Sequence, residues 1–100
     1  MTPEFHSEDS SGYGAGLRCP LCKGEHIHHG RVDVFERCED ADAGTHVGVL
    51  GGEVRVSTML AGNPSARRNG LTVAFTCENC HGSSVLSLAQ HKGVTYLDFK

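Results

Sequence analysis

The sequence has no tryptophan, and phenylalanine and tyrosine make up 6% of its 100 residues. Its hydrophobic content of 38% is enough for one small domain, and a core this lean usually needs a disulfide, a metal or a partner. No hydrophobic run approaches the roughly 18 residues that span a membrane, so we expect no membrane-spanning segment. The N-terminus also lacks a basic, hydrophobic leader, which predicts a reducing, cytoplasmic location. In such a location five cysteines favour metal binding over disulfides.

A strong charge of one sign is missing as well. The nine Lys and Arg residues are set against twelve Asp and Glu residues, which gives a net charge of −3 with neutral histidine. Three of the acids, Glu4, Glu8 and Asp9, precede residue 18, so residues 18–100 carry no net charge. A balanced domain has no overall field that would draw it onto a polyanion. Nucleic acid would therefore need a local basic patch.

The first 17 residues are polar and end in a glycine-rich run, Gly12-Tyr13-Gly14-Ala15-Gly16. This composition predicts a disordered tail over residues 1–17, followed by a single domain over residues 18–100.

Beyond the tail, hydrophobic residues recur at every second position, which is the period of half-buried strands. The clearest runs are Val32 with Val34, Val54 with Val56, Leu71 with Val73 and Phe75, Leu86 with Leu88, and Val94 with Tyr96. They predict an all-β domain of five or six short antiparallel strands, with loops at 38–46 and 61–70. Residues 83–91 fit a strand better than a short helix, because they lie between a cysteine pair and another alternating run.

The cysteines carry the most specific signal. Cys19 and Cys22 form one pair with two residues between them, and Cys77 and Cys80 form another. This spacing lets the backbone curl so that both sulfurs of a pair point at one ion. Zinc prefers four tetrahedral ligands and binds thiolates well. The four cysteines are therefore predicted to hold one structural Zn²⁺.

The two pairs are unusually far apart, because 54 residues separate Cys22 from Cys77, whereas compact sites have about 15–20. Closing the longer loop costs only about 1 kcal/mol more, and structural zinc contributes on the order of 10 kcal/mol. One shared site is therefore expected. Gly24 and Gly82, each two residues after the second cysteine of its pair, are expected to supply a positive φ or a close approach.

Other thiol chemistries stay open. A Cys-Pro-x-Cys pair also occurs in thiol–disulfide oxidoreductases at a helix N-terminus, although the residues after Cys22 make a poor amphipathic helix. Four thiolates can also bind iron. The fifth cysteine, Cys38, lies among Glu36, Glu39 and Asp40, which is an unfavourable place for a thiolate. We expect an incidental thiol there, with an alternate zinc ligand or a redox sensor as the alternative.

The two six-residue segments 19–24 and 77–82, together with the strands that follow, resemble a zinc ribbon over residues 18–100. The strands at 84–90 and 94–99 are similar to the hairpin of that fold. The chain also resembles small bacterial and prophage-encoded proteins of unknown function. The resemblance implies a zinc ribbon with an inserted antiparallel β-sheet. It implies little about function, because transcription factors, ribosomal proteins, polymerase subunits, primases and adaptors share the fold.

Two surface segments have distinct charge. The loop at 61–70 carries Arg67 and Arg68, whose adjacent guanidiniums suit phosphate contacts. With Arg55 and Lys92 they would form a small basic face that contacts nucleic acid or a partner. Acidic residues gather at 33–42, and His26, His28 and His29 form a cluster. We expect both of these groups to be solvated surface, with a second metal site as the alternative for the histidines.

Catalytic motifs are missing: there is no Gly-x-Ser-x-Gly, no His-Glu-x-x-His and no phosphate-binding glycine loop. A zinc ion with four cysteine ligands also has no open position for a substrate. We therefore expect a non-enzymatic adaptor that binds a protein or nucleoprotein partner through its sheet and the 61–70 loop. The alternatives are direct nucleic-acid binding through Arg67 and Arg68, and a thiol redox sensor.

Overall fold

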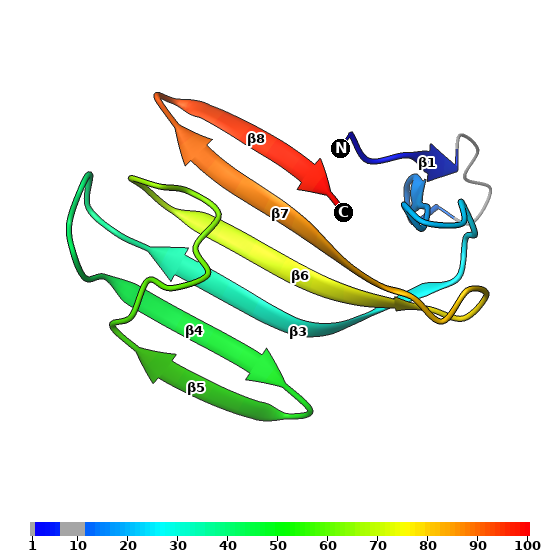
Figure 1. Ribbon diagram of the computed structural model, residues 1–100, viewed down its shortest axis with the longest axis horizontal. Helices are drawn as coiled ribbons and strands as arrows, with labels where there is room; N and C mark the ends of the chain where they lie inside the picture. The colour runs from blue at the N-terminus through cyan, green and yellow to red at the C-terminus, as the bar shows by residue number, and fades with distance from the viewer. Residues whose placement is uncertain (1, 7–11) are drawn as a thin grey trace.

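The computed structural model describes residues 2–6 and 12–100, and within these ranges the chain is all-β, without a helix (Figure 1). The strands are β1 (Phe5–His6), β2 (Gly16–Leu17), β3 (Ile27–Glu36), β4 (Thr45–Leu50), β5 (Glu53–Ser57), β6 (Gly70–Cys77), β7 (Ser83–His91) and β8 (Val94–Phe99). The all-β prediction is confirmed, and residues 83–91 form a strand. The described residues include no helix that is long and apolar enough to cross a membrane.

Six of the strands form one antiparallel sheet in the order β5-β4-β3-β6-β7-β8. The strands between the two cysteine pairs and the C-terminal hairpin are therefore parts of the same sheet, because β6 pairs with β3 on one side and with β7 on the other. β3 also contains a bulge between His29 and Val32. The cysteine pairs lie at one end of this sheet, and the loops at 37–44 and 58–69 lie at the other end (Figure 1).

The register places hydrophobic side chains on one face in two complete rows that cross all six strands. From β5 to β8, the first row is Val54, Val49, Val32, Val73, Leu86 and Phe99, and the second row is Val56, Val47, Val34, Leu71, Leu88 and Leu97. Neighbours in a row are directly opposite each other on adjacent strands, so each row is a continuous hydrophobic band. We call this face the apolar face.

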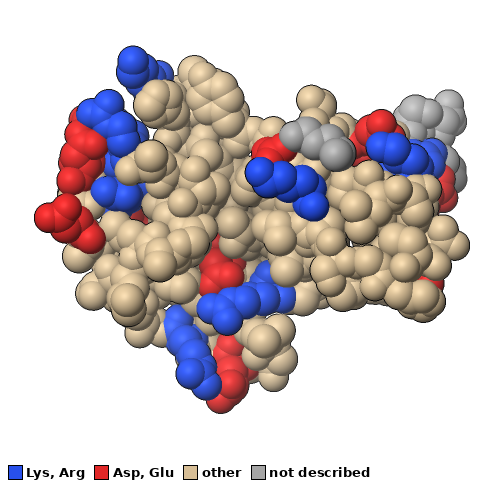
Figure 2. Space-filling model, viewed as in Figure 1, with Lys and Arg blue, Asp and Glu red and all other residues tan. Residues whose placement is uncertain are grey.

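The opposite face carries the charged residues of the described strands other than Glu36, and we call it the polar face (Figure 2). One of its rows runs Arg55, Gly48, Asp33, Thr72, Ser87 and Asp98. Arg31 Nε donates to an Asp33 oxygen at 2.9 Å, and His46 Nε2 lies 2.7 Å from the other Asp33 oxygen. These two contacts, the one with Arg31 above all, hold the pKa of the Asp33 carboxyl below its ordinary value.

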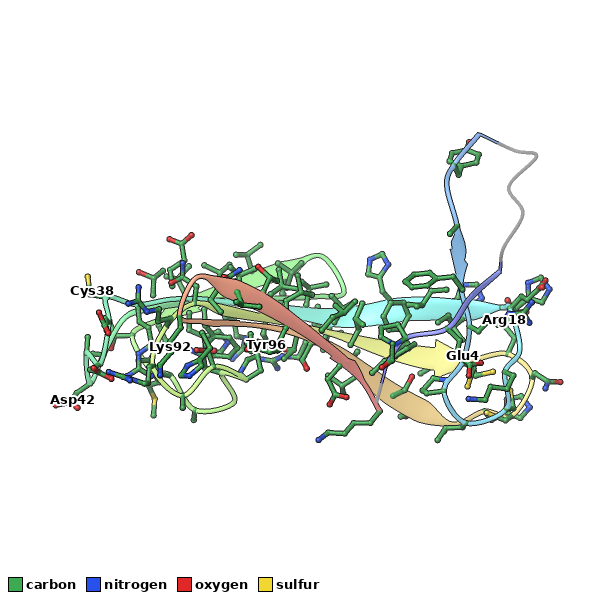
Figure 3. All side chains as sticks on the ribbon, turned by 90° about the horizontal axis from the view of Figure 1, so that it is seen from above. Glu4, Arg18, Cys38, Asp42, Lys92 and Tyr96 are labelled. Atoms are coloured by element: carbon green, nitrogen blue, oxygen red, sulfur yellow. The ribbon has the colours of Figure 1, made fainter. Side chains whose placement is uncertain are left out.

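The β5–β6 loop covers the polar face at the end away from the cysteines. Phe35, which is only 2% exposed, stacks on the His46 ring with centroids 4.3 Å apart. Gly62 lies against the same phenyl ring, since a Cβ there would be 3.6 Å from it. Ser65 Oγ then donates to the Gln90 carbonyl at 2.7 Å, which fastens the loop to β7. The loop therefore covers one face of the sheet only (Figure 3).

Part of the segment predicted to be a disordered tail is paired. β1 and β2 form a two-stranded antiparallel sheet, the Arg18 N–H donates to the Glu4 carbonyl at 2.8 Å, and Lys23 Nζ lies 3.3 Å from the Glu4 carboxylate. These contacts are mostly made by the backbone, so composition does not reveal them. Residues 1 and 7–11 of the predicted tail lie outside the described residues.

Candidate metal centre

Two turns bring four cysteines together at one end of the sheet. The first turn precedes β3, and the second joins β6 to β7. The sulfurs of Cys19, Cys22, Cys77 and Cys80 all lie within 4.8 Å of one another, and the 19–80 and 22–77 distances are 3.8 and 3.6 Å. Metal–sulfur bonds of about 2.3 Å in a tetrahedron would place the sulfurs about 3.8 Å apart. The cluster could therefore hold a metal ion, as the sequence predicts, and none of its cysteines is in a disulfide.

The two turns have the same backbone hydrogen bonds. In the first, the Cys19 N–H donates to the Gly24 carbonyl at 2.8 Å, and the Lys23 N–H donates to the Cys19 carbonyl at 2.9 Å. The second turn repeats both bonds at 3.1 and 3.0 Å through Cys77, His81 and Gly82. Each turn therefore presents its two sulfurs in the same way, and the four sulfurs come from two equivalent halves.

Glycine has a steric role in these turns. The positive φ belongs to Lys23 (67°) and His81 (60°) and not to the glycine that follows each. A Cβ at Gly82 would lie 2.5 Å from the Leu21 side chain, and one at Gly24 would lie 3.2 Å from the sulfur of the preceding cysteine. Of the two roles expected for these glycines, the structure therefore shows the close approach.

Several N–H groups donate to the sulfurs. The Leu21 N–H is 3.4 Å from Cys19 Sγ, and the Cys80 N–H is 3.5 Å from Cys77 Sγ. Such bonds offset negative charge on a thiolate, and metal binding requires the thiolate form. These N–H donors therefore favour the thiolate form of the two sulfurs even without a metal ion.

The thiols nevertheless cannot all ionise easily by themselves. The Asn79 side-chain amide, 3.4 Å from Cys22 Sγ, and the Gly24 N–H lower the pKa of the Cys22 thiol to about 6. The Gly82 N–H also lowers the pKa of the Cys80 thiol, but desolvation and the other three cysteines outweigh it and raise that pKa to about 11. One thiolate forms readily and another is opposed by its neighbours. A bound cation would relieve this imbalance, because it favours the ionised form of every ligand.

The histidine cluster supports the second turn. His28 Nε2 contacts the Glu78 carboxylate, and the Glu78 N–H donates to the His26 carbonyl at 2.9 Å. The first contact connects β3 to the second turn, and the second contact connects the residue before β3 to the same turn. Apart from the four cysteines, no group of three or more His, Cys, Asp or Glu side chains within the described ranges is placed to hold a metal.

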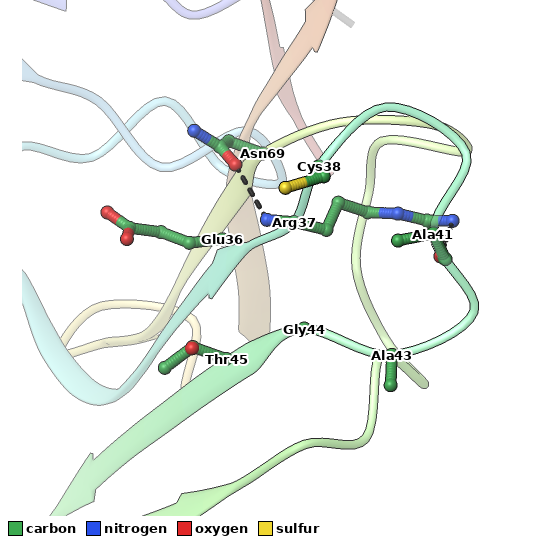
Figure 4. Close-up of a pocket in the computed structure, with 8 residues that line it drawn as sticks. All are labelled: Glu36, Arg37, Cys38, Ala41, Ala43, Gly44, Thr45 and Asn69. Carbon is green, nitrogen blue, oxygen red and sulfur yellow. Dashed lines mark hydrogen bonds between the residues drawn. The ribbon is translucent and has the colours of Figure 1, made fainter.

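Cys38 lies away from the cluster, at the opposite end of the sheet (Figure 3). There it lines a pocket of about 430 Å³ with Glu36, Arg37, Ala41, Ala43, Gly44, Thr45 and Asn69 (Figure 4). The Arg37 N–H donates to Asn69 Oδ1 at 2.8 Å, and the Arg37 guanidinium donates to the carbonyls of Ala41 and Ala66. Arg37 thereby holds the 38–44 and 61–69 segments together. Cys38 is not a member of the four-cysteine group.

The predicted arginine tip is paired with acids. The Arg67 guanidinium lies 2.7 Å from both Asp40 carboxylate oxygens, and Arg68 lies 2.8 Å from Glu39. This contact with Arg67 holds the pKa of Asp40 below its ordinary value. The sequence predicts a bipolar surface with an acidic segment beside an arginine tip, but it does not predict which charges pair. The pairing of β3 with β6 brings them together, because one loop leaves the end of β3 and the other enters β6 there.

Of the other two predicted contact residues, only Lys92 lies at the same end of the sheet as Arg67 and Arg68. Lys92 is in the β7–β8 turn, with a φ of 50°, and the neighbouring Gly93 lines a pocket with Arg68. Arg55 is on β5, 3.7 Å from Glu53. β5 and β8 are the two edge strands of the sheet. Arg55 on β5 is therefore separated from Lys92, in the β7–β8 turn, by the strands between them.

One polar cluster was not anticipated from sequence. His46, held by Asp33 at Nε2, lies 3.5 Å from Ser57 Oγ at Nδ1, and Ser57 Oγ accepts the Met59 N–H at 3.4 Å. The three side chains belong to three adjacent strands, so they fasten β3, β4 and β5 together on the polar face. The spacing of these residues in the chain gives no hint of this contact, which follows only from the strand register.

No family model, curated protein or solved structure matches the chain. The four-cysteine cluster is compatible with a zinc-ribbon-like protein, and that likeness depends on the cysteine turns and the all-β sheet alone.

Proposed function

We propose that the protein is a non-enzymatic adaptor in which Cys19, Cys22, Cys77 and Cys80 hold one structural Zn²⁺. The closed donor set carries this proposal, because four sulfurs from two equivalent turns lie at separations that suit one tetrahedral ion. Thiolates suit zinc, and four protein ligands leave no position open for water or substrate. The ion would stabilise the fold and would take no part in a reaction.

The position of the site supports a structural role. It connects the turn before β3 to the turn between β6 and β7, and β3 and β6 are the central pair of the sheet. An ion there would fix one end of both strands and close the 54-residue connection between the cysteine pairs. The effect would be a rigid sheet that presents its surface to a partner.

The proposed contact surface lies on the polar face. Tyr96 and Val94 of β8 are 56% and 48% exposed, and the 61–70 loop reaches the same side of the sheet. Tyrosine is enriched among the residues that dominate protein interfaces. A protein partner is favoured over nucleic acid because Asp40 and Glu39 already neutralise Arg67 and Arg68. Nucleic-acid binding through these arginines, and a redox role for the thiols, stay as alternative predictions.

Affinity capture with quantitative mass spectrometry tests the adaptor role. We expect the tagged, metal-loaded chain to retain one protein in near-stoichiometric amount from a nuclease-treated lysate, and Tyr96→Ala to lose it. Tyr96 is exposed, so this substitution should leave the metal content and the circular dichroism spectrum unchanged. Leu17→Ala, at the other end of the molecule, is the matched control and should retain the partner. Repeated capture of no protein, or capture that nuclease abolishes together with salt-dependent binding to oligonucleotides, would contradict the adaptor role.

A further inference from the structure

Most of the apolar face is left uncovered by the residues that the structure describes. The buried hydrophobic residues of the described ranges are Cys19, Phe35, Cys77 and Phe99, and only Phe99 belongs to the two hydrophobic rows. Other row members are well exposed, such as Val56 at 70% and Leu97 at 44%. A sheet needs a second layer against its hydrophobic face. The β5–β6 loop covers the polar face instead, so no described segment supplies that layer.

The accessible area indicates how large the contact with a second layer would be. The chain exposes 6642 Å², whereas a compact monomer of its size would expose about 5,500 Å². Its radius of gyration of 14.8 Å also exceeds the roughly 13 Å of a compact domain of this length. The excess of roughly 1,100 Å² includes the projecting N-terminal segment, and it exceeds the roughly 800 Å² that each partner loses in a standard interface. The excess surface is thus comparable in size to one side of a standard interface.

The charge distribution indicates what kind of molecule fits. Among the described strand residues, the apolar face carries a single charged side chain, Glu36, at the end of β3, while Asp33, Glu53, Arg55 and Asp98 lie on the polar face. A charged partner would bury unpaired charge against this face, which is costly. A second copy brings the same uncharged rows, so both sides of the contact are satisfied.

We propose that two copies of this chain pack their apolar faces together as a two-layer β-sandwich. Two sheets packed face to face lie about 10 Å apart, with their strands within about 30° of each other. A two-fold axis makes the contact self-complementary, because each row meets a row of the same composition. The segment leading into β2 rises on the side of the sheet away from the β5–β6 loop, so it would flank the second copy (Figure 3). The polar face, with Tyr96, stays outward for the adaptor contact.

Sedimentation velocity on the full, metal-loaded chain tests this proposal, and we expect twice the chain mass from low micromolar concentration upward. Leu97→Lys places a charge in the second row and should weaken self-association roughly a hundredfold or more. Tyr96→Lys is the matched control, since Tyr96 is the neighbouring residue of the same strand, on the polar face, and is 56% exposed against 44% for Leu97. This variant should remain a dimer.

A second measurement needs no substitution. In a mixture of isotope-labelled and unlabelled wild-type chains, intermolecular NOEs should connect the methyl groups of Val47, Val49 and Leu88. A wild-type chain that stays monomeric near millimolar concentration would overturn the proposal, as would a dimer whose intermolecular contacts lie on the polar face or the sheet edges. The adaptor role is tested by affinity capture, and the dimer is tested by the sedimentation mass. Either proposal can therefore fail without the other. A monomer whose Leu97→Lys variant loses a captured protein would show that a different protein covers the apolar face.

Discussion

Replacing Cys77 with serine is expected to abolish metal binding and to leave the chain unfolded at room temperature. Cys77 is only 4% exposed, its sulfur lies 3.6 Å from Cys22 Sγ, and serine would replace the thiolate with a hydroxyl that binds zinc poorly. Structural zinc contributes on the order of 10 kcal/mol, which is comparable to the whole free energy of unfolding of a small domain, about 5–15 kcal/mol. Circular dichroism and metal analysis of the purified variant would show the loss.

Cys38→Ser is the matched control for this experiment. Cys38 is exposed and lies at the opposite end of the sheet, so its removal should leave the metal content and the unfolding transition unchanged. A folded Cys77→Ser chain with full metal content would contradict the four-cysteine site. Loss of metal from Cys38→Ser would mean that the fifth cysteine is a ligand.

Replacing Phe99 with alanine should lower the free energy of unfolding by about 3–5 kcal/mol. Phe99 is fully buried at the end of the first hydrophobic row, and its ring meets the Phe75 ring edge-on with centroids 5.5 Å apart. Truncation would leave a cavity in a core that has few other buried side chains. Chemical denaturation of the metal-loaded protein at one fixed concentration measures the loss, because self-association makes stability depend on concentration.

Tyr96→Ala is the comparison for Phe99→Ala, since it removes a large aromatic side chain from the same strand but from the exposed polar face. We expect it to change the free energy of unfolding by less than about 0.5 kcal/mol. Equal losses for the two variants would mean that Phe99 does not anchor the sheet. A loss confined to Phe99 would confirm the register that places these residues on opposite faces.

Much of the fold could be predicted because local patterns decide it. Strict alternation, as at Leu71, Val73 and Phe75, allows one face of a strand to be buried and hardly any other structure. The cysteine spacing is equally local, so both turns could be recognised from residues 19–24 and 77–82 alone. These two signals were enough to predict an all-β chain with a four-cysteine metal site.

The remaining features depend on contacts between distant segments. The pairing of Arg67 with Asp40 requires the knowledge that β3 lies beside β6, and alternation says nothing about strand order. For the same reason the sequence could not show that the inserted strands and the C-terminal hairpin form one sheet. The pairing of β1 with β2 was hidden because backbone hydrogen bonds in Gly-rich sequence leave no side-chain signature.

Native mass spectrometry of the untagged protein, purified under reducing conditions, tests the central claim most directly. We expect one zinc ion per chain, and loss of the folded charge states when a chelator removes it. Ions of twice the chain mass should carry two zinc ions if the apolar faces pair. A metal-free chain with two disulfides would contradict the structural zinc site and would make thiol chemistry the better account of the four cysteines.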